Sequence, residues 1–228
     1  MRRIFFVILS LGVQLNTVAS DATIHTTDDR KKIGQGITVL ATVYYDSSYN
    51  EKFKLTNSEE GKSNSSQDPS KHHFDNLFEK VKHRFNKQNV SITINVTNVT
   101  QINNLSDPYE GSKLSINGTQ TFHNLRNYSM HLGASNNTVY FLFTLSNIYK
   151  ENDRGDRVPL AVSDIATYGT FCTNYVSAAV VKDSSARWSY LNAVEALANT
   201  FGVSRYSRFF TPDLETMKET FRRCHAGD

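Results

Sequence analysis

Apolar runs of strand length alternate with amphipathic helical runs along this chain, which leaves few architectures open to it. The predicted strands are rich in β-branched and aromatic residues and cover Ile37–Tyr45, Ser91–Val96, Thr138–Leu145 and Tyr175–Val181. The predicted helices cover Ser70–Lys87 and Trp188–Phe201, with a short one near Phe122–Tyr128. This order favours a three-layer α/β domain with a mixed, mostly parallel twisted sheet flanked by helices.

Length and charge narrow the range of functions. The 228 residues suffice for one substantial core, and no internal repeat or linker marks a second domain. The 25 basic and 22 acidic residues are interspersed and give a net charge of only +3. We therefore expect no nucleic-acid partner and no membrane-surface partner. We also expect a monomeric protein.

The N-terminus has the pattern of a secretory signal. Arg2 and Arg3 precede the apolar run Ile4–Val13, and Val18-Ala19-Ser20 is a small-residue cleavage site. We expect a signal peptide over residues 1–20, a short N-terminal segment over 21–35 and a single domain over 36–228. No later segment is apolar for long enough to span a bilayer. The sequence thus predicts a secreted, extracellular protein.

Two further features suit that compartment. Asn-x-Ser/Thr acceptors for N-linked sugar occur only in the first two thirds of the chain, at Asn64, Asn89, Asn95, Asn98, Asn104, Asn117, Asn127 and Asn136. The cysteines are Cys172 and Cys224 alone, and two cysteines in an oxidising compartment are expected to form a disulfide. A polar surface loop is the alternative interpretation of the Asn-rich region.

The segment Val194–Tyr206, VEALANTFGVSRY, has the frame of a zinc-protease helix and turn. A helix with the pattern His-Glu-x-x-His binds zinc because residues four apart lie on one helical face. A Gly then ends the helix and turns the chain toward a third His. Gly202 is present here, but no His occurs between His131 and His225. This helix therefore cannot supply His ligands for zinc.

The run Ala166-x-x-Gly169-x-x-Cys172-Thr173, followed by a strand and the Gly202 helix, resembles the reprolysin (adamalysin) group of metzincin metalloproteases. It is most similar to the secreted salivary members found in ticks. The resemblance implies a metzincin-like domain over residues 36–228. It also implies that Met217 sits at the family's methionine turn, and that Phe221-x-x-Cys224 matches the closing motif whose Cys pairs with Cys172.

The resemblance also shows what this chain lacks. With Gly202 set on the family's Gly, Glu195 stands at the first His, Ala196 at the catalytic Glu, Asn199 at the second His and Arg205 at the third. A catalytic zinc needs three protein ligands and a water. An amide is a poor ligand, a permanent cation repels the metal, and Ala supplies no general base. We expect an inactive protease-like domain with no metal and no cofactor.

No other catalytic or metal site is predicted. His72 and His73 are neighbours on a helix and point about 100° apart, so they cannot share an ion. The remaining histidines are too far apart or lie close to a predicted sugar, and each His is expected to be a solvated surface residue. Gly-rich phosphate loops are absent.

The function expected from this pattern is binding without cleavage. The family aligns an extended peptide on an edge strand through backbone hydrogen bonds, which needs no catalysis. The matching edge here lies within Ala161–Gly169, with Ile165, Ala166 and Thr167 as contact residues. The partner is then an extracellular protein or peptide, of a host by the resemblance. Proline at Ile165 or Thr167 is expected to abolish docking.

Two alternatives belong to other classes. The first is an active secreted zinc metalloendopeptidase with a divergent site, which predicts chelator-sensitive cleavage of a generic protein. The second is a sugar-shielded glycoprotein that binds lectins or masks a surface, which predicts that removal of the sugar abolishes activity.

Overall fold

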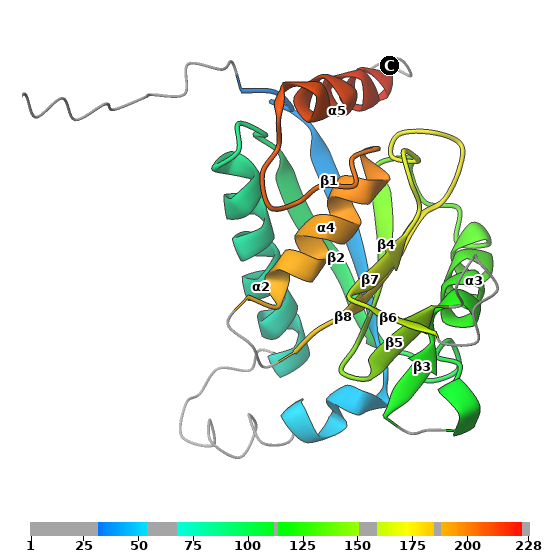
Figure 1. Ribbon diagram of the computed structural model, residues 1–228. Helices are drawn as coiled ribbons and strands as arrows, with labels where there is room; N and C mark the ends of the chain where they lie inside the picture. The colour runs from blue at the N-terminus through cyan, green and yellow to red at the C-terminus, as the bar shows by residue number, and fades with distance from the viewer. Residues whose placement is uncertain (1–31, 54–67, 112–113, 151–158, 185–187, 225–228) are drawn as a thin grey trace, which may run out of the picture. The chain divides into compact units, whose positions relative to one another are not determined.

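The computed structural model describes residues 32–53, 68–111, 114–150, 159–184 and 188–224, which belong to one compact unit. The main sheet has five strands in the order β2-β1-β4-β8-β7 (Figure 1). These strands are β1 (Thr38–Tyr45), β2 (Thr93–Gln101), β4 (Thr138–Thr144), β7 (Asp164–Ala166) and β8 (Ser177–Lys182). All neighbouring pairs are parallel except β7 and β8, which are antiparallel. The predicted mixed, mostly parallel sheet is confirmed.

Helices cover both faces of this sheet (Figure 1). Helices α2 (Pro69–Asn86) and α4 (Tyr190–Thr200) pack on one face, and α3 (Gly118–Met130) packs on the other. Strand β4 shows why: Phe141 and Phe143 point to the α2 and α4 side, while Tyr140 and Leu142 point to the α3 side. Because both faces are covered, every residue of β4 is buried, and the predicted three layers are confirmed.

A second, smaller sheet was not predicted from the sequence. It contains β3 (Ser115–Asn117), β5 (Asn147–Lys150) and β6 (Leu160–Val162) in the order β3-β5-β6. The predicted edge segment 161–167 therefore divides at Ser163. Its first part belongs to the second sheet as β6, and its second part is the edge strand β7 of the main sheet.

The C-terminal segment also differs from the expectation. Helix α5 covers Thr211–Arg223, and Met217 lies fully buried at its centre. The methionine turn suggested at this residue is therefore wrong. Met217 fills the core together with Leu214 and Phe221, which share one face of the helix because they lie three and four residues from it. Two short 3₁₀ helices also occur in the described residues, η1 (Ser47–Tyr49) and η2 (Tyr109–Gly111).

The domain begins earlier than residue 36. The backbone of Ile33 accepts a hydrogen bond from Ser91 at 2.7 Å and donates one to Asn89 at 2.9 Å. A side chain added at Gly34 would meet Ile92 and Phe221 at 3.0 Å, so the backbone lies directly on the core here. The predicted signal peptide over residues 1–20 lies outside the described residues. Within these residues, no helix combines the length and apolar composition needed to cross a membrane.

A buried carboxylate joins the end of β8 to α2 and η1. The Oδ2 of Asp183 accepts hydrogen bonds from Tyr49 Oη at 2.9 Å and Lys52 Nζ at 2.9 Å, and His73 Nε2 lies 3.1 Å away. The side chain of Asp183 is only 1% exposed. Burial by itself raises the pKa of Asp183, but the contact with His73 and the charge of Lys52 outweigh it and hold the pKa below its usual range. His73, which we expected to be a solvated surface residue, is partly buried, with 26% of its side chain exposed, and lies beside this carboxylate.

Candidate functional site

The helix predicted to carry the relic zinc motif is α4, and it ends where the sequence indicates. Gly202 has φ +86°, in the left-handed region that Gly adopts without strain. Its N–H donates to Asn199 O at 2.9 Å, and the N–H of Val203 donates to Ala198 O at 2.9 Å. This pair of bonds is a Schellman motif, which satisfies the last carbonyls of the helix. Glu195 and Asn199 are four residues apart in α4 and therefore lie on one face of the helix.

That face of α4 meets the edge strand β7. The Oγ of Ser163 lies 3.0 Å from Asp164 Oδ1 and 3.4 Å from Glu195 Oε2, so one hydroxyl stands between two carboxylates. The Nδ2 of Asn199 donates to Asp164 Oδ2 at 3.4 Å. Ser163, Asp164, Glu195 and Asn199 are all partly buried, and we call them the edge cluster. Two of the four predicted motif positions, Glu195 and Asn199, thus come together with two residues that the sequence did not single out.

Burial sets the electrostatics of the edge cluster. Burial first, and the Glu195 carboxylate second, raise the pKa of Asp164 to about 7, although the hydrogen bonds to Ser163 and Asn199 act in the opposite direction. Burial also raises the pKa of Glu195, against the hydrogen bond to Ser163. Two acidic groups that approach each other in a partly dry place resist ionising together. The edge cluster can therefore take up a proton near neutral pH.

The other motif positions lie elsewhere. Ala196 is fully buried in the core beneath α4. Arg205 is exposed, and its guanidinium lies 5.4 Å from the ring centroid of Phe210 in a cation–π contact. Arg205 is thus a cation that packs on an aromatic ring near the start of α5.

These residues do not fit a catalytic zinc. The edge cluster offers two carboxylates, and its amide nitrogen already donates to one of them. No group of three His, Cys, Asp or Glu residues that could hold a metal occurs in the described parts of the chain. A catalytic site of the expected type needs three such ligands and an open position for water.

Within the predicted edge segment, Asp164–Ala166 forms the edge strand β7 of the main sheet. Ser163 O accepts from Lys182 N at 2.9 Å, and Thr167 N donates to Ala178 O at 2.9 Å. Hydrogen-bonded pairs alternate along an antiparallel ladder, so Ile165 also directs its backbone groups toward β8. Proline at Ile165 or Thr167 would therefore break the sheet itself. The test suggested by the sequence is unsuitable at these two positions.

The backbone groups of β7 that face away from the sheet belong to Asp164 and Ala166, the residues on either side of Ile165. By the same alternation, the backbone N–H and C=O of Asp164 and Ala166 point away from β8. Strand β7 has no second neighbour among the strands of the described residues. The side chain of Ile165 packs in the core on the α3 side, which leaves Asp164 and Ala166 on the α4 side. The edge cluster therefore lies directly beside the free edge.

The predicted disulfide is present between Cys172 and Cys224. It joins the loop after β7 to the end of α5, and Arg223 adds hydrogen bonds to the carbonyls of Gly169 and Phe171 at 3.0 and 3.1 Å. The loop also donates to the end of α4, from Gly169 N to Asn199 O at 2.9 Å. These bonds fix α4 and α5 relative to the loop that follows the edge strand.

The predicted sugar acceptors differ in their surroundings. Five side chains are exposed, at Asn95, Asn98, Asn104, Asn127 and Asn136, and Asn64 lies outside the described residues. Asn117 is partly buried and accepts a hydrogen bond from Gln120 N at 3.1 Å as the N-cap of α3. Sugar at these positions stays a prediction.

Asn89 lies in different surroundings from the exposed acceptors. The residue is 9% exposed and its φ is +65°, at the turn that ends α2. The N–H of Val90 donates to Phe85 O at 3.1 Å and that of Asn89 to Asn86 O at 3.3 Å, which is a second Schellman motif. Asn is the residue after Gly that best tolerates this backbone. Asn89 therefore has a role in the turn, and a buried residue leaves less room for a sugar than the exposed acceptors do.

Comparisons with known proteins give distant likenesses only. No family model matches this chain, and no curated protein matches its sequence. The fold is similar to archaemetzincin from Methanopyrus kandleri, with 10% identity and a TM-score of 0.42 over 81% of this chain and 96% of that one. It is also similar to a chain in the structure of a chaperone–substrate complex, with 9% identity and a TM-score of 0.41. That match covers 73% of this chain but 23% of the other. Likenesses this distant assign neither a family nor a function.

Proposed function

We propose that this chain is a secreted, monomeric glycoprotein whose metalloprotease-like domain binds an extended segment of an extracellular protein at β7 and does not cleave it. The observation that carries the proposal is the free edge of β7 beside α4. Unpaired backbone groups at a sheet edge are a template for one more strand. The resemblance to reprolysins, which align a peptide on such a strand, supports the same surface.

The geometry of β7 suits a short docked segment. Two residues, Asp164 and Ala166, direct their backbone groups outward, and a strand laid against them can bond to both. The strand is short, so affinity must come from side chains as well as from the backbone. The edge cluster lies at this place and carries the acidic groups Asp164 and Glu195, which favour a Lys or Arg in the docked segment by charge complementarity.

The lack of cleavage in the proposal rests on the donor set. Glu195 and Asn199 replace two zinc ligands, Ala196 replaces the general base, and Arg205 packs on Phe210. Without a metal to lower the pKa of a bound water, no hydroxide nucleophile forms near pH 7. The domain then keeps the recognition surface of a protease and lacks its reaction.

The experiment starts from a displayed library of random linear 12-residue peptides, selected on the folded chain from a glycosylating cell line. Peptides that bind are measured against wild type, Ala166→Pro and Ala166→Ser. Proline removes the outward N–H of residue 166, whereas serine keeps it at nearly the same size. We expect at least tenfold weaker binding to Ala166→Pro and little change for Ala166→Ser. Equal binding of the selected peptides to all three would overturn the edge-strand function.

Measurements on the same secreted protein test the two alternative functions. Cleavage of casein that stops with a chelator, together with about one zinc per chain after dialysis against trace zinc, would establish an active metalloendopeptidase. Peptide binding that is lost on enzymatic removal of sugar and is unaffected by Ala166→Pro would favour the sugar-shielded, lectin-binding glycoprotein.

A further inference from the structure

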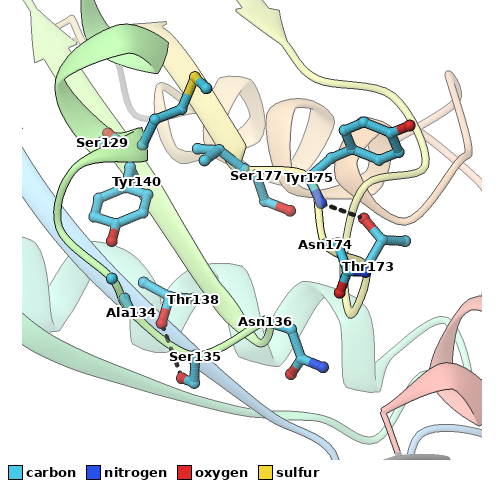
Figure 2. A pocket seen from close by; sticks show the side chains of 13 residues that line it. Ser129, Ala134, Ser135, Asn136, Thr138, Tyr140, Thr173, Asn174, Tyr175 and Ser177 are labelled. Atoms are coloured by element: carbon cyan, nitrogen blue, oxygen red, sulfur yellow. Dashed lines mark hydrogen bonds between the residues drawn. The ribbon is translucent and has the colours of Figure 1, made fainter.

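A cleft of about 560 Å³ opens on the opposite end of the main sheet from the Asp183 network, at the amino ends of β4 and β8. Figure 2 shows its walls: the turn from α3 into β4 on one side, and the loop that leads into β8 on the other. The two walls are joined where Asn136 O accepts a hydrogen bond from Cys172 N at 2.9 Å. Since Cys172 is held by the disulfide, this bond fixes both walls.

The lining of the cleft is polar but carries no charge. None of its 13 lining residues is Asp, Glu, Lys, Arg or His. Hydroxyls dominate, and some are already engaged with one another, as in the 3.2 Å contact of Ser135 Oγ with Thr138 Oγ1. Ser129, which also lines the cleft, has a buried Oγ with no hydrogen-bond partner among the described residues. A neutral ligand with many hydroxyls matches this lining better than an ion does.

An exposed aromatic ring stands at the same cleft. Tyr175 is 75% exposed, and its ring projects from the loop wall in Figure 2. Its backbone N–H is bonded to Thr173 Oγ1 at 3.1 Å, so the loop below the ring is held in place. A flat ring beside hydroxyl groups is suited to a sugar, which has an apolar C–H face and a polar rim.

The sequence offers a source for such a ligand, because Asn136 lines this cleft. It is exposed and begins the acceptor sequence Asn136-Asn137-Thr138. We propose that the cleft seats the first N-acetylhexosamine units of an N-linked glycan on Asn136, which pack against Tyr175. This inference rests on the secreted-glycoprotein part of the proposed function. In the modification, the bond between C1 of the sugar and the diphosphate oxygen of the lipid donor breaks as Asn136 Nδ2 bonds to C1. The lipid diphosphate leaves, and the amide proton passes to it or to solvent.

A tethered sugar fits this cleft better than a free one. Shallow neutral clefts offer few strong contacts, so a free monosaccharide binds weakly. A sugar attached within the cleft has an effective concentration in the millimolar range or above, which makes weak contacts sufficient. The seated glycan would then clamp the α3–β4 turn against the loop that carries the disulfide.

The test is a double-mutant cycle on protein secreted from a glycosylating cell line. Peptide mapping first measures sugar occupancy at Asn136. Melting temperature is then measured for wild type, Asn136→Gln, Tyr175→Ala and the double variant. We expect Asn136→Gln to lower the melting temperature by about 2–4 °C in wild type and by much less in Tyr175→Ala. Tyr168, which is 64% exposed and does not line the cleft, is the control, and Tyr168→Ala should preserve the full Asn136→Gln effect.

A second readout reports the contact itself. Protons of the first sugar should shift upfield in NMR spectra through the ring current of Tyr175, and lose that shift in Tyr175→Ala. An occupied Asn136 with no ring-current shift and no coupling overturns the seat. Sugar at other acceptors but none at Asn136 overturns it as well and leaves the secreted glycoprotein standing. A chain with no sugar at all contradicts both, whereas peptide binding at β7 is decided separately by Ala166→Pro.

Discussion

Asn199 donates a hydrogen bond from its amide Nδ2 to Oδ2 of Asp164, over 3.4 Å. This contact joins helix α4 to the edge strand β7 of the main sheet. A His at position 199 would direct a lone pair toward a metal, whereas the amide here directs a donor toward a carboxylate. The amide of Asn199 therefore forms a bond between helix and sheet.

Asp164→Asn should stabilise the protein relative to wild type, and this gain should be larger at pH 8 than at pH 5. The pKa of Asp164 is raised to about 7, so between about pH 4 and pH 7 the native state holds a proton that the unfolded chain has lost. The free energy of unfolding of wild type therefore falls as pH rises through this window. The neutral amide avoids this loss, and we expect a gain of about 1–2 kcal/mol at pH 8 that vanishes near pH 5. Urea unfolding at both pH values checks it; a difference that is independent of pH contradicts it.

Glu195→Gln should lower the pKa of Asp164. The Glu195 charge is one of the two causes that raise this pKa, and the substitution removes it while leaving an oxygen for Ser163. A carboxyl-carbon NMR titration of Asp164 measures the change. Glu215→Gln removes an exposed carboxylate that pairs with Lys218 on α5 and serves as the matched control. A titration of Asp164 that is the same in both variants would show that the two carboxylates do not interact.

Asp183→Asn should destabilise the fold by about 2–4 kcal/mol, because it removes the charge that Tyr49, Lys52 and His73 surround in a buried place. The pKa of Asp183 is lowered, so its contribution is present above about pH 4 and is lost as pH falls further. The variant should therefore show a weaker loss of stability in acid than wild type. Asp75→Asn, which breaks an exposed pair with Lys71 on α2, should cost about 0.5 kcal/mol or less. Similar costs for both variants in urea unfolding would refute the prediction.

Loss of the disulfide should lower the free energy of unfolding substantially. Cys172 and Cys224 are 52 residues apart, and the loop-entropy relation gives about 4 kcal/mol for a loop of this length. We expect about 2–4 kcal/mol for Cys172→Ala/Cys224→Ala, measured by urea unfolding against the oxidised wild type. Reduced wild type should match the variant. An unchanged midpoint would show that the hydrogen bonds of Arg223 hold the two segments without the cross-link.

Asn89 should carry no sugar in the secreted protein, since its side chain is buried at the turn after α2. Glycopeptide mapping measures this directly, with the exposed Asn95 and Asn127 as internal references. Because residue 89 has φ +65°, Asn89→Gly should be neutral or stabilising by up to about 1 kcal/mol, and Asn89→Ala destabilising by about 1 kcal/mol. Full occupancy at Asn89 would mean that this turn is built differently.

The sequence predicts the elements whose pattern is complete within one segment. Helix α2 repeats Phe74, Leu77, Phe78, Val81 and Phe85 at helical spacing, and all five are buried. Strand β4 has an unbroken apolar run from Val139 to Phe143 because it lies between two covered faces. The turn after α4 follows from Gly202, since few other residues adopt its backbone.

The elements that were missed depend on distant partners. The strands of the second sheet have three or four residues each, too few to show a period. Helix α5 has its apolar residues at helical spacing, but the family resemblance predicted a turn at Met217. Asp164 is a single acid in an apolar segment, and its partner Asn199 lies 35 residues further on. Only the packing of α4 against β7 reveals that these two residues form a site.

The predicted sugar acceptors on β2 make the two edges of the main sheet different. Asn95 and Asn98 are exposed on this strand, which forms the edge opposite β7, and no acceptor sequence follows Asn136 in the chain. Sugar chains on β2 would stand beside the backbone groups that a neighbouring copy needs for pairing. Another strand could then be added at the β7 edge of the sheet but not at the β2 edge. Strand addition to such a sheet stops after a single partner, so it yields a one-to-one complex and not a fibre.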